Sequence, residues 1–308
     1  MSADGERIGF IGLGAMGAGM AGRLLDAGFA VHGFDVRAEA LARLTAAGGR
    51  AARSPRAAAE DAGLLVIMVA TSAQADDVLF GPDGAVAALP RGATVMLSST
   101  VAPEYARRLG QRLAERGHEL LDAPVSGGVV GAESGSLVIM ASGSARAFAV
   151  AERALAAMSK HVYRLGDAPG AGSTVKMINQ VLAGIHIAAA AEAIALGVRA
   201  GADPRVLFEV ISKSAGSSWM FQNRVPHMLA GDYTPLSALD IFVKDLGIVL
   251  EAGRALRFPL PLAAAAHQLF LMGAAAGFGR EDDAAVVKVF ETLAGIDVAR
   301  AASAPPGG

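Results

Sequence analysis

The sequence predicts an α/β domain followed by an all-helical domain. Short apolar runs alternate with segments of helical periodicity as far as about residue 166. From about residue 170 onward the periodicity is helical and no segment is typical of a strand. The chain of 308 residues is also long for one hydrophobic core. We therefore expect domains at 1–166 and 167–308, with the boundary in the Gly- and Pro-rich stretch RLGDAPGAG.

The first half predicts a mostly parallel, doubly wound sheet. Helical segments such as 15–28 and 102–116 separate the apolar runs, and strand–helix–strand alternation is typical of a parallel sheet covered on both faces. The expected strands are RIGFIGLG at 7–14, an apolar run closed by glycines, AVHGFDV at 30–36, and the runs 64–71, 93–100 and 118–126.

The first strand is followed by a G-x-G-x-x-G motif that indicates dinucleotide binding. Gly12 allows a tight turn, Gly14 allows the backbone to approach a pyrophosphate, and Gly17 allows close packing of helix on strand. The helix start offers N–H groups and a positive dipole end to the phosphates. The motif alone could be a plain glycine-rich turn, but here it ends a strand and opens a helix. We expect this Rossmann-type turn to bind the cofactor through Gly12, Leu13, Gly14, Ala15, Met16 and Gly17.

An acidic residue at the end of the second strand predicts the cofactor. The carboxylate of Asp35 can accept hydrogen bonds from the ribose hydroxyls and repels a 2′-phosphate, so NAD is expected over NADP. Arg37 would soften this preference, although we favour its interpretation as a solvated loop charge.

The second half predicts helices at 170–201, 204–214, 218–230, 238–256, 260–277 and 284–294. Between Ala168 and Ala191 the only formal charge is Lys176. At roughly 100° per residue it shares one helix face with Ser173, Asn179, Gln180 and Ala183, opposite an apolar face. From this spacing alone, Lys176 is either a functional residue or a lysine that extends to solvent between domains.

Composition excludes several classes of protein. The net charge of −2 gives no sign of a nucleic-acid or membrane-surface partner. The absence of cysteine excludes disulfides and thiolate metal sites, and the six histidines show no metal-ligand spacing, so no metal is expected. The start of the chain has no apolar signal-peptide core, and we expect a cytoplasmic protein. The uncharged stretch 258–279 resembles a membrane span in length, but its prolines, glycines and alanines favour a buried helix.

Five stretches together resemble the 3-hydroxyisobutyrate dehydrogenase family, the β-hydroxyacid dehydrogenases. They are FIGLGAMGAGMAGRL (10–24), SSTVAPE (98–104), DAPVSGG (122–128), GAGSTVKMINQ (170–180) and FVKDLGIV (242–249). The resemblance implies a Rossmann domain joined by a long helix to an all-helical domain, in homodimers or homotetramers formed through the helical domain. Segments 216–229 and 232–249 look like the L-threonate dehydrogenase branch of this family.

The same resemblance implies roles for individual residues. Lys176 would be the catalytic lysine and Asn179 would support the substrate, a small hydroxy acid. Ser126, Gly127 and Gly128 would hold the substrate carboxylate, and Thr100 and Lys244 would flank the nicotinamide. Many relatives carry Asp in a D-x-S-T motif where this chain has Leu97. Ser217, Ser218, Trp219, Phe221 and Asn223 are further candidates to line the substrate pocket, although Trp219 is equally typical of a core residue.

A lysine that accepts a proton near neutral pH needs its pKa lowered from about 10.4 to about 7–8. A surface ion pair contributes only about 0–1 kcal/mol, which is too little, whereas burial and a nearby positive charge can supply the shift. We therefore expect Lys176 to be buried, with Lys244 and the cationic cofactor ring as the nearby charges.

Other functions remain open from the sequence. Within the same architecture the chain could be a 3-hydroxyisobutyrate dehydrogenase, or a tartronate or succinic semialdehyde reductase. An imine reductase is disfavoured because such relatives usually replace the lysine. A catalytically silent cofactor-binding protein is the alternative from another class, and it is disfavoured by the presence of Lys176, Asn179 and Ser126.

Overall fold

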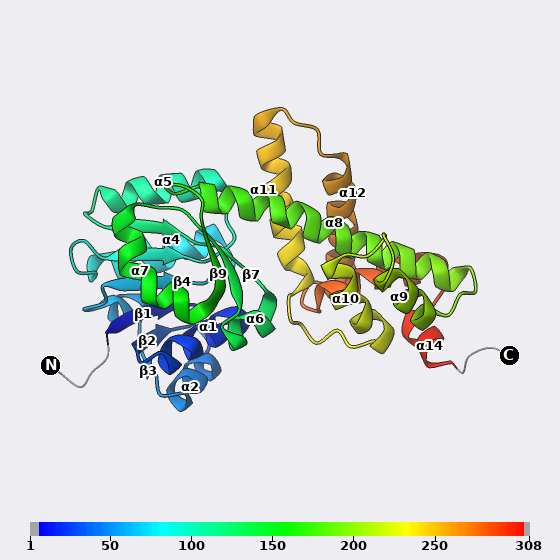
Figure 1. The fold of residues 1–308 in the computed structure, drawn as a ribbon, viewed down its shortest axis with the longest axis horizontal. Helices are drawn as coiled ribbons and strands as arrows, with labels where there is room; N and C mark the ends of the chain where they lie inside the picture. The colour runs from blue at the N-terminus through cyan, green and yellow to red at the C-terminus, as the bar shows by residue number, and fades with distance from the viewer. Residues whose placement is uncertain (1–5, 305–308) are drawn as a thin grey trace. The chain divides into compact units, whose positions relative to one another are not determined.

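The computed structural model describes residues 6–304. The chain divides into two compact units, one ending at Met177 and the other beginning at Ile178. The division falls within one long helix, α8 (Ala171–Arg199) (Figure 1). The first turns of α8 thus belong to the first unit. The domain boundary that we expect between residues 166 and 167 remains a prediction.

The first unit contains the predicted parallel sheet. Its six strands are all parallel and lie in the order β3-β2-β1-β4-β5-β6. The strand order reverses between β1 and β4, and ligands of open α/β sheets bind beyond the carboxyl ends of the strands at such a point. The strands are β1 (Arg7–Ile11), β2 (Ala30–Phe34), β3 (Arg50–Ala51), β4 (Leu64–Ile67), β5 (Thr94–Leu97) and β6 (Glu119–Asp122).

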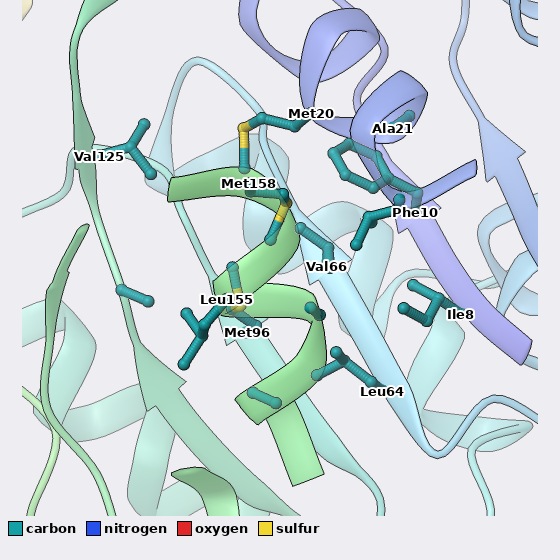
Figure 2. Close-up of a cluster of buried hydrophobic side chains, with 14 of the residues drawn as sticks. Ile8, Phe10, Met20, Ala21, Leu64, Val66, Met96, Val125, Leu155 and Met158 are labelled. Atoms are coloured by element: carbon teal, nitrogen blue, oxygen red, sulfur yellow. The ribbon is translucent and has the colours of Figure 1, made fainter. Parts of the chain in front are cut away.

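Side chains on alternate positions of the strands fill two apolar clusters, one on each face of the sheet. Ile8 and Phe10 belong to one cluster, whereas the next residue along the strand, Ile11, belongs to the other. Figure 2 shows the first cluster, in which Leu155 and Met158 of helix α7 pack with side chains of the sheet. The helices of this unit are α1 (Ala15–Asp26), α2 (Ala38–Ala46), α3 (Pro55–Ala59), α4 (Ser72–Phe80), α5 (Pro103–Ala114), α6 (Gly128–Ser134) and α7 (Ala145–Met158), with a 3₁₀ turn at Ala85–Ala87.

A second, three-stranded sheet was not predicted. The segment 118–126, expected as one strand, ends in the first sheet at Asp122 and resumes as β7 (Val125–Ser126) in the second. Pro124 separates the two pieces, and a proline has no N–H to donate to a strand ladder. Strand β7 pairs antiparallel with β8 (Leu137–Ala141), and β8 pairs parallel with β9 (Ser159–Arg164).

The described part of the second unit is helical, as predicted. After α8 come α9 (Pro204–Ser212), α10 (Trp219–Ala230), α11 (Leu239–Leu256), α12 (Pro261–Gly273), a π-helical turn at Ala274–Phe278, a 3₁₀ turn at Asp283–Val286, α13 (Val287–Ala294) and α14 (Val298–Ser303). Helices α11 and α12 lie side by side (Figure 1), and the rings of Phe242 and Phe270 stack between them with centroids 5.2 Å apart.

Two helices among the described residues are long and apolar enough to cross a membrane by length and composition, namely α8 and the stretch Pro261–Phe278. One or two such helices are weak evidence, because core helices meet the same criterion. The expectation of a buried helix at 258–279 is wrong for the single chain. Only one face of α12, with Ala263, Ala266 and Phe270, is buried, while Leu262 is 68% exposed.

Candidate active site

The glycine-rich turn has the close packing that its sequence predicts. Gly12 has a φ of +94° and donates its N–H to the carbonyl of Phe34 at 2.9 Å. A Cβ on Gly17 would lie 1.9 Å from the carbonyl oxygen of Gly12, so only glycine fits there. Helix α1 begins directly after Gly14, and no side chain caps its first turn. These residues fit a pyrophosphate at the helix start.

Asp35 lies at the end of β2 and is bonded to the same turn. Its Oδ2 accepts the N–H of Leu13 at 2.7 Å, and its Oδ1 accepts the backbone N–H and the Nε of Arg37 at 2.9 and 3.1 Å. Burial acts to raise the pKa of Asp35, but the hydrogen bonds from Arg37 and Leu13 outweigh it and lower the pKa below its usual range. The carboxylate is therefore ionised at neutral pH and can accept hydrogen bonds from the hydroxyl groups of a ribose.

Arg37 is more than the solvated loop charge that we favoured from the sequence. Its side chain is 53% exposed, yet it forms the ion pair with Asp35. Its Nη2 lies 3.7 Å from the position that a Cβ on Gly14 would take. The guanidinium thus lies beside the glycine-rich turn, where it offsets part of the negative charge of Asp35.

Two buried hydroxyl groups follow the carboxyl end of β5. Ser98 and Ser99 precede Thr100, and the Ser99 hydroxyl accepts the N–H of Val69 at 3.0 Å. Leu97, the last residue of β5, is fully buried in the apolar cluster that contains Ile11. The Ser99 hydroxyl thus bonds the backbone that follows the neighbouring strand β4.

The loop DAPVSGG crosses from the first sheet to the second. Ser126 ends β7, and Gly127 and Gly128 lead directly into α6. Gly127 accepts the N–H of Gly131 through its carbonyl at 3.1 Å, which closes the first turn of that helix. The serine hydroxyl and the backbone N–H groups of the glycine pair provide several hydrogen-bond donors in a short stretch of chain.

Lys176 is buried, as expected. Lys176 is 7% exposed, and Ser173 and Gln180 on the same helix face are also buried. On the other side of α8, Val175 and Ile178 are 41% and 54% exposed. The polar stripe predicted on this helix therefore faces inward, and the apolar stripe faces outward in the single chain.

The second unit contains a polar chain that begins at Asn179. Its Nδ2 donates to Oε1 of Gln180 at 3.0 Å, and Nε2 of Gln180 donates to Oδ2 of Asp245 at 2.6 Å. The other oxygen of Asp245 lies 2.8 Å from Nζ of Lys244. Asp245 is 2% exposed. Two predicted site residues, Asn179 and Lys244, are thus joined through Gln180 and Asp245.

The remaining candidates lie around the start of α10. The Ser218 hydroxyl accepts the N–H of Phe221 at 3.0 Å and caps the helix, and the Ser217 hydroxyl accepts from Nε2 of Gln222 at 3.0 Å. Trp219 is 62% exposed, so the alternative that it is a core residue is wrong. Phe221 is 4% exposed and belongs to the interior.

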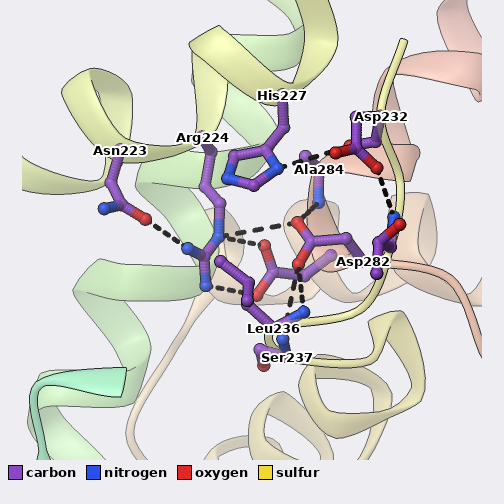
Figure 3. Close-up of polar contacts among 10 residues, drawn as sticks. Asn223, Arg224, His227, Asp232, Leu236, Ser237, Asp282 and Ala284 are labelled. Carbon is purple, nitrogen blue, oxygen red and sulfur yellow. Dashed lines mark hydrogen bonds and ion pairs between the residues drawn. The ribbon is translucent and has the colours of Figure 1, made fainter. Parts of the chain in front are cut away.

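Asn223 is held by a buried ion pair that the sequence did not reveal. Its Oδ1 accepts from Arg224 (Figure 3). Nε and Nη2 of Arg224 donate to the carboxylate of Asp283 at 2.5 and 3.0 Å. Burial raises the pKa of Asp283 to about 6, although the contact with Arg224 opposes the shift. The pair is 59 residues apart in sequence, which is why spacing gave no signal.

Across residues 6–304, no three His, Asp or Glu side chains are grouped so that they could hold a metal ion. The residues do fit a dinucleotide, through the Gly12–Gly17 turn, the uncapped start of α1 and the ionised Asp35. Fold and site together define a nicotinamide-dependent dehydrogenase with a Rossmann domain and a helical domain.

Comparisons with known proteins agree with this class. The family model for the NAD-binding domain of 6-phosphogluconate dehydrogenase matches residues 7–166, and the model for the NAD-binding part of NADP-dependent 3-hydroxyisobutyrate dehydrogenase matches residues 170–290. An L-threonate dehydrogenase of Cupriavidus necator is 58% identical over 92% of this chain and 96% of its own length. That of Escherichia coli K12 is 48% identical over 93% and 95%. A crystal structure of a 3-hydroxyisobutyrate dehydrogenase from Salmonella typhimurium superposes with a TM-score of 0.88 at 49% identity, over 92% of this chain and 99% of that one.

The chain belongs to the 3-hydroxyisobutyrate dehydrogenase family, in the branch of the L-threonate dehydrogenases. It is an NAD-dependent dehydrogenase, as the sequence predicted. The catalytically silent alternative therefore loses its support.

Proposed function

We propose that this enzyme oxidises L-threonate at C2 to 2-dehydro-L-erythronate with NAD, and that Lys176 is the general base. One observation carries the catalytic part of the proposal, namely a lysine that is only 7% exposed on the inner face of α8. The substrate part is supported by the L-threonate dehydrogenases that are 45–58% identical to this chain over nearly its whole length.

The proposed roles follow the chemistry of each group. Bound NAD supplies the hydride acceptor, and the protein supplies orientation and a proton acceptor. Ser126, Gly127 and Gly128 bind the substrate carboxylate through hydroxyl and N–H donors. Lys176 accepts the proton of the C2 hydroxyl group, and burial favours the neutral amine that this task requires.

Asn179 and Lys244 have supporting roles. Asn179 supports the substrate through its amide, and Gln180 and Asp245 hold that amide and the Lys244 ammonium in place. Thr100 and Lys244 flank the nicotinamide.

The substrate hydroxyl groups at C3 and C4 require further polar partners. Because Oδ1 of Asn223 accepts from Arg224, its Nδ2 remains a donor for a substrate oxygen. The Ser218 oxygen accepts the N–H of Phe221, and its own O–H remains a donor. With Ser217, these groups give the site a set of fixed hydrogen bonds for a polyhydroxy acid.

The test is an initial-rate assay of NADH formation with L-threonate, D-threonate, D-erythronate, glycerate and 3-hydroxyisobutyrate under identical conditions. A site that pairs its polar groups with substrate hydroxyls rejects analogues that lack them by about 10⁴-fold. L-Threonate should therefore give the highest kcat/KM, and 3-hydroxyisobutyrate should be a very poor substrate.

A second candidate function has a specific observation in its favour. The Salmonella typhimurium structure that is 49% identical to this chain is described as a 3-hydroxyisobutyrate dehydrogenase. If 3-hydroxyisobutyrate or glycerate matches L-threonate in the assay, the L-threonate assignment is wrong and this candidate replaces it. Faster NADH consumption with tartronate or succinic semialdehyde would instead favour a reductase.

We also propose that a second copy of the chain covers the outer face of α8 and that the enzyme acts in the cytoplasm as a homodimer or homotetramer. Ile178 and Leu182 are each 54% exposed and Leu196 is 67% exposed, all on one side of this helix. Light scattering after size exclusion should give a multiple of the 31.1 kDa chain mass, and a monomer would contradict the proposal.

A further inference from the structure

A fully buried carboxylate lies at the start of α8 and has no role in the chemistry described above. Asp122 is the last residue of β6 and is 0% exposed. Its Oδ2 accepts the N–H groups of Gly170 and Ser173 at 2.9 and 2.8 Å and the Ser142 hydroxyl at 3.3 Å. Its Oδ1 accepts the Ser173 hydroxyl at 2.6 Å. Four donors therefore surround one buried acid.

Ser142 completes the arrangement from the end of β8. Its hydroxyl oxygen accepts the N–H of Gly172 at 2.9 Å. Ser142 and Asp122 also pair through their backbones, with N–H to O distances of 3.0 and 2.8 Å. The first N–H groups of a helix have no partner within the helix. In α8 three of them are bonded by side chains that come from two strands of the sheets.

The backbone of α8 also lies directly against these strands. A Cβ on Gly172 would lie 2.3 Å from the carbonyl oxygen of Met140 and 2.6 Å from that of Asp122. No larger residue fits at position 172 without moving the helix. The position of the helix start is therefore fixed both by close approach and by the hydrogen bonds of Asp122.

Lys176 follows these anchored residues by one helical turn. It is four residues after Gly172 and three after Ser173, so the three residues share one face of α8. Asp122 is also four residues before Ser126, the start of the proposed carboxylate-binding loop. One side chain thus connects the helix that carries the base with the strand that leads into this loop, all within the first unit.

We propose that Asp122 is a positioning residue that sets Lys176 at the correct place relative to Ser126, Gly127 and Gly128. This inference rests on the proposed role of Lys176 as the general base. Its physical basis is that a misplacement of about 1 Å can reduce turnover about 10²-fold, even when the cause lies away from the reacting atoms.

The ionised carboxylate is the form that suits this task. Every group that faces its two oxygens is an N–H or O–H donor, so both oxygens act as acceptors. An amide of the same shape would turn its NH₂ group toward one of these donors. Asp122→Asn therefore breaks the contact with little change in volume, which makes it the sharpest single substitution for the test.

The experiment compares Asp122→Asn and Ser173→Ala with Ser144→Ala. Ser144 caps α7 in the same unit, where its hydroxyl accepts the N–H of Ala147 at 3.1 Å and donates to Glu119 at 2.9 Å. Helix α7 carries no proposed site residue, so this variant controls for the loss of a helix cap. For each protein, kcat, KM, the Kd of NADH, Tm and the deuterium isotope effect on kcat with C2-deuterated L-threonate are measured.

Asp122→Asn should lower kcat about 10²-fold with the Kd of NADH unchanged, and its isotope effect should rise because proton and hydride transfer become slower. Ser173→Ala, which removes one of the four hydrogen bonds, should show a smaller change in the same direction. Ser144→Ala should lower Tm and leave kcat and the isotope effect as in the parent.

A purely structural role would lower Tm in all three variants and leave kcat and the isotope effect unchanged, and that result would overturn the proposal. If Asp122→Asn does not fold, Ser173→Ala decides by the same criteria. The base role is tested separately. Substantial turnover by Lys176→Ala would refute the role of Lys176, whereas an inactive Lys176→Ala beside fully active Asp122 and Ser173 variants would refute only the positioning role.

Discussion

Two buried carboxylates bind α8, Asp122 in the first unit and Asp245 in the second. Their partners on the helix are Ser173 and Gln180, and Lys176 lies between these two residues in the sequence. Asp122 is bonded to Ser173 and to backbone N–H groups, which are neutral and fixed donors. Asp245 is bonded to the amide of Gln180 and paired with the ammonium of Lys244. The partners differ in charge and in mobility.

The difference indicates what each acid does. Backbone N–H groups cannot move independently of their helix, so a carboxylate that binds them fixes the helix itself. A lysine side chain has many rotamers, so a carboxylate that binds it fixes one side chain. We therefore assign Asp122 to the placement of α8 and Asp245 to the placement of Lys244 and Asn179.

The largest effect is expected from the residue between these two acids. Lys176→Ala should abolish measurable turnover, since a general base contributes about 10²–10⁴-fold. Asp122 is bonded to Ser173 and Asp245 to Gln180, and the substitution leaves these side chains in place, so folding and the Kd of NADH should be retained. Steady-state rates and NADH fluorescence titration measure both. Lys160→Ala, at an exposed lysine of β9, is the control and should be fully active.

Asp245→Asn should give the next largest effect. Loss of one member of a buried ion pair costs about 3–5 kcal/mol, and we expect about 1–3 kcal/mol here because the Lys244 side chain is 23% exposed. Urea unfolding measures this change, and kcat/KM should fall as well. The pair of Arg7 and Asp61 supplies the control, since the Asp61 side chain is 89% exposed and Asp61→Asn should change stability little. If the two variants lose the same unfolding free energy, Asp245 contributes no more to stability than a solvent-exposed carboxylate.

A third carboxylate extends the comparison to the cofactor. Asp35 is paired with Arg37 at the edge of the glycine-rich turn, where it should select NAD by repelling a 2′-phosphate. Asp35→Ser should narrow the ratio of kcat/KM for NAD over NADP, because it removes this repulsion and leaves the charge of Arg37. Arg37→Ala should widen the ratio. A parent enzyme that prefers NADP would contradict the assignment.

The smallest effect concerns the charge of Asp122. Burial raises its pKa, while hydrogen bonds from Ser173, Gly170 and Ser142 oppose the shift. A carboxyl whose pKa is raised on folding contributes stability below its unfolded pKa of about 3.9, and that contribution is lost as pH rises through the folded value. The difference in unfolding free energy between parent and Asp122→Asn should therefore fall from about pH 4 upward toward neutrality. A constant difference across this range would show that the pKa of Asp122 is not raised.

Local patterns were sufficient for the fold and for part of the site. Apolar runs, the turn from Gly12 to Gly17 and the position of Asp35 predicted the parallel sheet and the cofactor turn, because each depends on residues close in sequence. The single formal charge between Ala168 and Ala191 singled out Lys176 as well. The roles of Lys176, Asn179 and the substrate loop remain predictions that came from the family resemblance.

Long-range partners were beyond the sequence. Arg224 and Asp283 are 59 residues apart, Gln180 and Asp245 are 65 apart, and Asp122 meets Ser173 across 51 residues. No periodicity connects such positions. The short second sheet was missed because Pro124 interrupts what looked like one strand, and the exposed face of α12 was missed because apolar composition does not tell which chain covers a helix.

The central claim is that buried Lys176 accepts the proton of L-threonate during its oxidation. The most direct measurement is kcat/KM for NADH formation from L-threonate as a function of pH, in the parent and in Lys176→Arg. The kcat/KM of the parent enzyme should rise with pH to a plateau as the lysine loses its proton. Lys176→Arg should be inactive at every pH tested, since a guanidinium is not a base near neutral pH. A parent profile that is flat or falls with pH, or a Lys176→Arg enzyme that follows the parent, would contradict the claim.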